Sequence, residues 1–95
     1  MDQKPQQQIQ IRAIDKDLKG VYSNLMQVTH TQEEFILDFF NVIGLSGVLS
    51  TRVILSPGHL KRMIQALAEN MGRYEQKFGT VSPAEPPKQE IGFKP

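Results

Sequence analysis

Histidine is the side chain most often used to move protons near neutral pH, and the chain carries two, His30 and His59. Neither belongs to a His-x-x-x-His repeat or to another spacing that would gather three metal ligands. His59 also follows the expected start of a helix, where the helix dipole disfavours the charged imidazole. We therefore expect both to be surface or structural histidines rather than metal ligands or bases.

Asp38 is the one acidic residue inside an otherwise apolar run, residues 35–40. A general base in a pocket would have this setting. A carboxylate paired with Arg52 on a neighbouring strand, or a charge that guards a sheet edge, would have it too. We favour the two structural interpretations. Glu33 and Glu34 adjoin a turn and would point in opposite directions along a strand, so they do not form a glycosidase-like pair.

The segment Gly44-Leu45-Ser46-Gly47 has the glycines of a phosphate-binding loop but not its Gly-Lys-Ser/Thr ending. Ser46 also lacks the flanking residues of a nucleophile elbow. The chain has no cysteine, which excludes thiol catalysis, disulfides and Cys-ligated zinc or iron–sulfur sites. With no nucleophile, base and oxyanion donors in view, we predict a protein that is not an enzyme and has no cofactor or metal site.

The charge balance, eleven Lys and Arg against ten Asp and Glu, gives a formal net charge of +1. This balance argues against long-range attraction to nucleic acid or acidic membranes. Basic residues do gather after Pro57, but acids interrupt them, and we favour a solvated face there over a nucleic-acid surface. The basic positions are Lys61, Arg62, Arg73 and Lys77, and the acids are Glu69 and Glu75.

Membrane and export signals are missing from the sequence. No run approaches the roughly 18 apolar residues that span a bilayer. Residues 1–8 are polar and lack the apolar core of a signal peptide. We expect a soluble protein, located in the cytoplasm.

The length of 95 residues fits one domain. A chain this short hides only about 60–65% of its unfolded surface, so association would stabilise it. Residues 1–8 are Gln-rich and are expected to form a disordered tail. The prolines of residues 80–95 exclude helix and sheet and predict an extended tail. A single α+β domain is therefore expected over residues 9–79.

Four segments have the composition or alternation of strands, which predicts an antiparallel sheet of three to four strands. They are residues 9–12, 21–30, 34–42 and 51–55. Turn-forming residues follow the first segment, and a polar connection follows the second. Residues 43–50 contain two glycines and are expected to form a loop.

The strand expected at residues 34–42 is apolar on both faces. Phe35, Leu37 and Phe39 would lie on one face, and Ile36, Phe40 and Val42 on the other. Such a strand must be covered on both sides. Since one helix covers one face, we expect a homo-oligomer, a dimer or tetramer, or another protein partner. The expected oligomer or partner surface comprises Ile36, Phe40, Val42, Leu45, Val48 and Leu49.

One long amphipathic helix is expected at the C-terminal end of the domain. Ser56 supplies a cap, Pro57 suits the first turn and Gly79 suits the end. Apolar residues recur at spacings of 4, 3, 4, 3 and 4 at Leu60, Ile64, Leu67, Met71, Tyr74 and Phe78. This stripe suits a lid on the chain's own sheet, which we favour, or a helix–helix dimer.

Four short blocks, in order, resemble the bacterial and archaeal domain-of-unknown-function family 3467. The blocks are Gly20–Asn24, Glu34–Phe39, Arg52–Pro57, and Asn70 with Tyr74-Glu75 and Phe78-Gly79. The resemblance covers about residues 18–81. It implies a small standalone protein and supplies no activity and no catalytic residue.

Asn24, Asp38 and Arg52 are the polar members of these blocks without an evident role. We hypothesise that a buried hydrogen-bond network links them. The expected layout, antiparallel strands followed by a long helix, is also similar to that of the export chaperone SecB, although only by analogy of fold.

Three functions are consistent with these features. The first, which we favour, is an oligomeric protein-interaction or adaptor protein. The second is a holdase-like chaperone of SecB-like layout. The third is a nucleic-acid-binding module that uses the basic helix positions.

Overall fold

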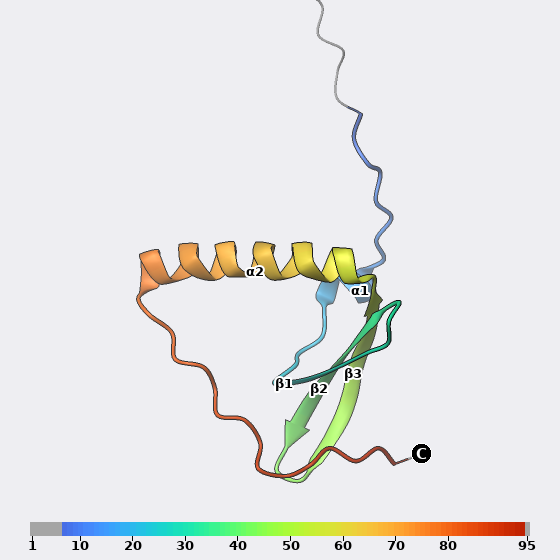
Figure 1. The fold of residues 1–95 in the computed structure, drawn as a ribbon, viewed down its shortest axis with the longest axis vertical. Coiled ribbons are helices and arrows are strands. Elements are labelled where there is room, and N and C mark those ends of the chain that lie inside the picture. Colours follow the sequence, from blue (N-terminus) through green and yellow to red (C-terminus); the bar gives the residue numbers. More distant parts are fainter. Residues whose placement is uncertain (1–6, 95) are drawn as a thin grey trace, which may run out of the picture. The chain divides into compact units, whose positions relative to one another are not determined.

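A computed structural model describes residues 7–94 of the chain. It contains five regular elements (Figure 1). In chain order they are α1 (Asp15–Lys19), β1 (Leu25–His30), β2 (Phe35–Ile43), β3 (Ser46–Leu55) and α2 (Pro57–Phe78). The chain divides into two compact units, a sheet unit that ends at Ser56 and a helix unit that begins at Pro57.

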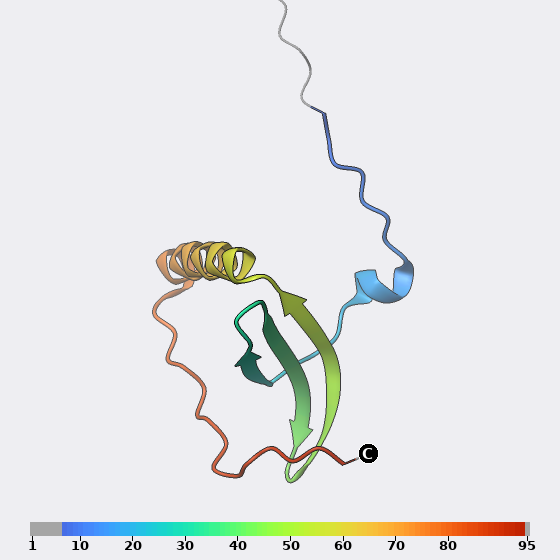
Figure 2. The same cartoon turned by 45° about the vertical axis from the view of Figure 1, so that its right-hand side comes forward.

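The sheet is a three-stranded antiparallel meander in the order β1-β2-β3. The register places Leu37 at the centre of β2, between Val28 of β1 and Val53 of β3. Figure 2 shows β2 and β3 curving together as one hairpin. The structure confirms the expected α+β class, with an antiparallel sheet followed by a C-terminal helix, and the number of strands is three.

The N-terminal part of the described chain differs from its prediction. Residues 9–12 form no strand, and Ile9 and Ile11 are exposed because no neighbouring strand pairs with them. The turn-forming residues that follow this segment form the short helix α1, with acidic residues in its first turn, which the helix dipole favours. Gly20, at φ 74°, ends α1. β1 then begins at Leu25 rather than at residue 21.

The expected loop at residues 43–50 is instead a tight hairpin. Ile43 pairs with Ser46, so only Gly44 and Leu45 connect β2 to β3. Gly44 has φ +62°, which glycine adopts without strain, and glycine at the first of two connecting residues is typical of a type II′ turn. β3 is consequently ten residues long, twice the length of the strand expected at 51–55.

A bulge interrupts the pairing of β2 with β3. Phe39 is opposite Thr51 and Phe40 is opposite Leu49, so Ser50 is an additional residue in β3. The Ser50 hydroxyl donates to the Tyr22 carbonyl oxygen at 3.0 Å. A bulge increases local twist, which agrees with the curvature of the hairpin.

The core of the sheet unit lies on β2. Leu37 is 3% exposed and Phe40 is 5% exposed. Odd- and even-numbered residues of a strand point to opposite faces, so these two buried side chains lie on opposite faces of the sheet. β2 therefore has buried residues on both faces within the single chain, whereas its doubly apolar sequence was expected to need a second copy or a partner to cover one face. Phe40 was expected on an open partner surface, but it belongs to the buried core of the single chain.

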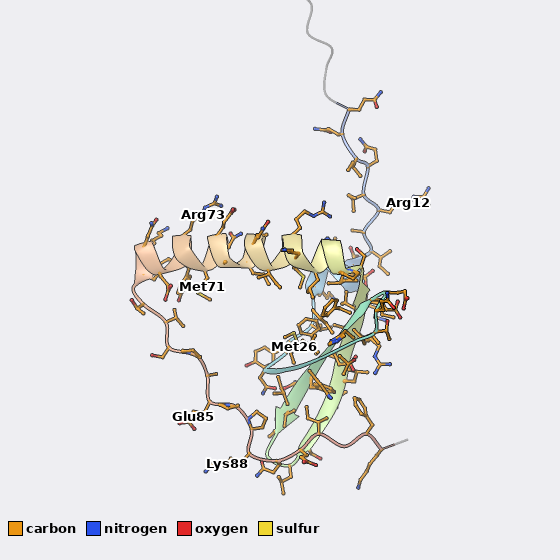
Figure 3. All side chains as sticks on the ribbon, in the orientation of Figure 1. Arg12, Met26, Met71, Arg73, Glu85 and Lys88 are labelled. Atoms are coloured by element: carbon orange, nitrogen blue, oxygen red, sulfur yellow. The ribbon has the colours of Figure 1, made fainter. Side chains whose placement is uncertain are left out.

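Helix α2 has the predicted bounds. It begins at Pro57 and ends at Phe78, where Gly79 at φ 97° donates its N–H to the Glu75 carbonyl oxygen at 2.9 Å. Met71 and Arg73 project from opposite sides of the helix (Figure 3). α2 is thus amphipathic, and residues 80–94 after it contain no helix or strand.

Candidate protein-interaction surface

The one ion pair within the sheet joins Asp38 to Arg52, which are directly opposite each other on β2 and β3. Arg52 donates from Nε to Oδ1 at 2.5 Å and from Nη2 to Oδ2 at 3.0 Å, so the contact is bidentate. Asp38 is 5% exposed, whereas the Arg52 side chain remains half exposed. The guanidinium therefore neutralises the one buried charge of the core strand.

The pair also fixes the protonation of Asp38. The hydrogen bond from Arg52 holds the pKa of the Asp38 carboxyl below its ordinary value, and the charge of Arg52 adds to this, although burial opposes it. The same bond raises the pKa of Arg52. A general base needs a raised or neutral-range pKa and a free oxygen, whereas both Asp38 oxygens accept bonds from Arg52. Asp38 is suited to holding β3 on β2 rather than to taking up protons.

Gln27 extends this row of polar residues onto β1, because it is directly opposite Asp38. Its Oε1 is buried and accepts no hydrogen bond. Gln27 has no evident role in the sequence alone, since only the strand register brings it beside Asp38. One face of the sheet thus carries a polar row of Gln27, Asp38 and Arg52 among apolar neighbours.

Asn24 has a different task from the one hypothesised for it. Its side-chain amide accepts the Val42 N–H at 2.9 Å and donates to the Val42 carbonyl oxygen at 2.8 Å. Its backbone N–H donates to the Phe40 carbonyl oxygen at 3.0 Å. The Asn24 side chain therefore continues the β1–β2 ladder by one step, and it does not take part in the Asp38–Arg52 pair.

The other polar residues considered in the sequence, the two histidines among them, do not form a common site. The His30 ring lies against the Phe35 ring, with centroids 5.2 Å apart. The Nδ1 atom of His59 lies 2.9 Å from Nη2 of Arg62 in the helix unit. The Thr31 hydroxyl accepts the backbone N–H groups of residues 33 and 34, which makes the expected turn. No three histidine, aspartate or glutamate side chains among residues 7–94 are grouped as metal ligands would be.

A set of exposed apolar residues of the sheet unit lies on β3 and at the tip of its hairpin. Leu45 at the tip is 86% exposed, and Val48 and Leu49 beyond it are exposed as well. Ile43 and Ile54 belong to the same exposed set. Of the six residues expected on a partner surface, Leu45, Val48 and Leu49 are open, Ile36 and Val42 are half-buried, and Phe40 is buried.

β3 also has a free backbone edge. It pairs with β2 alone, and β2 is the central strand. Asn24 bonds to Phe40 and Val42 on the β1 side of β2, so these two residues turn their backbone groups away from β3. Along an antiparallel pair, residues whose backbone groups bond to the partner strand alternate with residues whose backbone groups point away from it. Two residues directly opposite each other are of the same kind, so the β3 residues opposite Phe40 and Val42 also point their backbone groups away from β2. The outward-facing backbone groups of β3 are those of Gly47, Leu49, Arg52 and Ile54.

These features define a small α+β module with an ion pair on its sheet and, at one edge, the strand β3, whose outer side is unpaired. The sequence model of the family described as "Protein of unknown function (DUF3467)" matches residues 1–83, and the chain belongs to this family. No curated protein and no solved structure matches the chain. Within residues 7–94, neither helix combines the length and hydropathy that a bilayer crossing requires.

Proposed function

We propose that the protein is a small interaction module, or adaptor, that works as a homo-oligomer and has no catalytic activity. The observation that carries the proposal is the outer edge of β3, a ten-residue strand with exposed apolar side chains and one side unpaired. An exposed edge of this kind is a template for an added strand. The occupant we propose is an extended segment of a partner protein, apolar at alternate positions, which would bond to the outward backbone groups of β3.

The same edge carries features that limit uncontrolled pairing. Arg52 places a charge on it, and the Ser50 bulge twists it. A long flat strand from another copy would have to follow this twist over its whole length, whereas a short segment meets only part of it. The edge therefore suits a short partner segment better than open-ended stacking of copies.

Substitution at Ile54 separates the backbone edge from the side chain. Ile54→Pro removes one outward N–H without removing a bond to β2, and proline is tolerated at such edge positions. Ile54→Thr is the matched control, because it shortens the apolar side chain but keeps the N–H and the β-branching. Circular dichroism would establish that both variants keep the fold.

The probe is a random 12-residue peptide library, from which binders are selected and then titrated. We expect selected peptides to slow amide exchange at residues 47, 49, 52 and 54, and Ile54→Pro to weaken binding far more than Ile54→Thr. Peptides that protect other amides, or equal binding by the two variants, would refute edge binding. Binding of denatured proteins without sequence preference would indicate a holdase instead, and steep loss of binding with salt would indicate nucleic acid.

A further inference from the structure

The apolar stripe of α2 has a period of 3.5 residues rather than 3.6. Its six members, Leu60, Ile64, Leu67, Met71, Tyr74 and Phe78, alternate spacings of four and three without interruption. Ile64, Leu67, Met71, Tyr74 and Phe78 are 50–64% exposed. A strict 3.5-residue repeat is the pattern of a coiled-coil seam, in which the stripe faces another helix along its length.

We propose that α2 pairs with α2 of a second copy as an antiparallel two-stranded coiled coil. The inference rests on the homo-oligomeric part of the proposed function and adds which surface makes the oligomer and in which orientation. It does not use the β3 edge. The symmetry of the stripe, the charges beside it and the area that it would bury all favour this pairing.

The stripe is symmetric about position 69, so an antiparallel partner matches it layer for layer. Leu60 would meet the partner's Phe78, Ile64 the partner's Tyr74, and Leu67 the partner's Met71. Each layer thus joins one aliphatic residue to a larger or more flexible one. The Tyr74 and Phe78 rings already pack together within one helix, with centroids 4.9 Å apart. A parallel pair would instead oppose like rings in two successive layers, with the aliphatic residues concentrated at the other end.

Charges beside the seam select the same orientation. Lys61 and Glu75 each follow the same heptad position, one residue after Leu60 and Tyr74 respectively. An antiparallel pair brings Lys61 near the partner's Glu75, and the twofold axis repeats this contact. In a parallel pair the residue across from Glu75 would be the partner's Asn70, so no opposite charges would meet there. Val81 donates its N–H to Glu75 Oε2, which leaves Oε1 for a lysine.

The area is that of a weak dimer. Four half-exposed aromatic rings would bury roughly 400 Å², and eight aliphatic side chains would add about 400 Å² more. The sum lies near the lower limit of specific interfaces, roughly 1,000 Å². The dimer is therefore expected to dissociate on dilution, and its affinity should be sensitive to two charge contacts.

The test is a charge swap on the full chain, followed by sedimentation equilibrium at about 50 mM salt, where screening is moderate. Lys61→Glu or Glu75→Lys alone should weaken association about five- to thirty-fold, because each variant creates two like-charge contacts per dimer. The double variant should regain the wild-type constant. Glu75→Lys places a cation in the last turn of α2, which the helix dipole favours, and Lys61→Glu lies just past the first turn. Circular dichroism of both single variants would show whether the helix is retained.

Mixing the two single variants gives the sharpest outcome. One chain then has acids at both positions and the other has lysines, so the mixed pair has two opposite-charge contacts and should associate as well as wild type. Arg73→Glu, on the side of α2 away from Met71 (Figure 3), is the matched control and should leave association unchanged.

Three results would overturn the inference, and they differ in what they say of the proposed function. A dimer that is insensitive to both swaps would refute the α2 seam but leave the oligomer standing. A monomer at every concentration would refute both the seam and the oligomeric part of the proposal. Mixed single variants that stay as weak as each one alone would show that Lys61 does not meet the partner's Glu75, which refutes the antiparallel seam.

Discussion

Replacing Asn24 tests how a side chain can serve as part of a sheet. Its amide makes two hydrogen bonds with the backbone of Val42, at 2.8 and 2.9 Å, and so adds one rung to the pairing of β1 with β2. Asn24→Ala removes both bonds. Asn24→Asp keeps the shape and the bond from the Val42 N–H, but it turns an acceptor toward the Val42 carbonyl oxygen.

The expected loss follows from the two contacts. Each net hydrogen bond contributes about 0.5–1.5 kcal/mol. Because Asn24 is exposed, water replaces part of each bond, and we expect Asn24→Ala to lower the free energy of unfolding by about 1–2 kcal/mol. For a chain of this size that corresponds to a fall in Tm of roughly 4–16 °C. At neutral pH Asn24→Asp should be at least as destabilising, since the carboxylate faces a carbonyl oxygen.

Urea unfolding monitored by circular dichroism measures the loss. Asn70→Ala is the matched control: the Asn70 amide makes one bond to a carbonyl within α2, and alanine favours the helix, so stability should stay level or rise. Lowering the pH until the new carboxyl of Asn24→Asp is protonated should reduce the difference in free energy of unfolding between this variant and wild type. A protonated acid donates and accepts hydrogen bonds as the amide does. An Asn24→Ala variant as stable as wild type would refute the ladder role.

Three further outcomes are expected. Leu37→Ala should lower the free energy of unfolding by about 2–5 kcal/mol, because Leu37 is buried, and Val28→Ala on the exposed neighbour should cost clearly less in the same urea assay. The pKa of Asp38 is lowered by the bond from Arg52, so the stability that this pair adds is present above the ordinary carboxyl pKa and lost as pH falls through the lowered value. The free energy of unfolding of wild type should therefore fall toward that of Asp38→Asn on acidification. A difference in free energy of unfolding that does not change with pH would contradict this. Gly44→Ala should cost about 1–2 kcal/mol from backbone strain alone, since an added Cβ would meet no atom within 4 Å; an unchanged Tm would show that the turn adopts another form.

Signals confined to a few neighbouring residues were sufficient to predict α2 and the apolar nature of β2. Pro57 and Gly79 mark the ends of the helix, and its stripe repeats within the segment itself. Residues 9–12 show the limit of such signals. Their alternation describes which side chains share a face, but a strand also needs a neighbour to pair with, and pairing depends on distant parts of the chain.

Predicting the hairpin and the polar contacts also requires the register of the strands. Glycine first is typical of a type II′ turn, but Gly47 and the apolar residues near Gly44 made the segment resemble a longer loop, and only the pairing of Ile43 with Ser46 shows the tight turn. Asp38 and Arg52 were correctly considered as a cross-strand pair because opposite charges on neighbouring strands are a familiar arrangement. Asn24 was not, because its partners are backbone atoms of Val42, and no residue type identifies a backbone partner.

A module with one binding edge gains most from being a dimer. A single strand-addition site on a ten-residue strand that is interrupted by a bulge provides few backbone bonds, so its affinity for one segment should be modest. Two copies joined through α2 would present two edges, and a partner with two suitable segments would bind the second edge at a raised effective concentration. The double charge swap and either single variant can therefore be compared in binding as well as assembly. If the proposals are both right, weakening the seam should reduce affinity for a two-segment peptide while leaving a one-segment peptide unaffected. Equal loss for both peptides would mean that the seam supports the edge itself rather than the pairing of two edges.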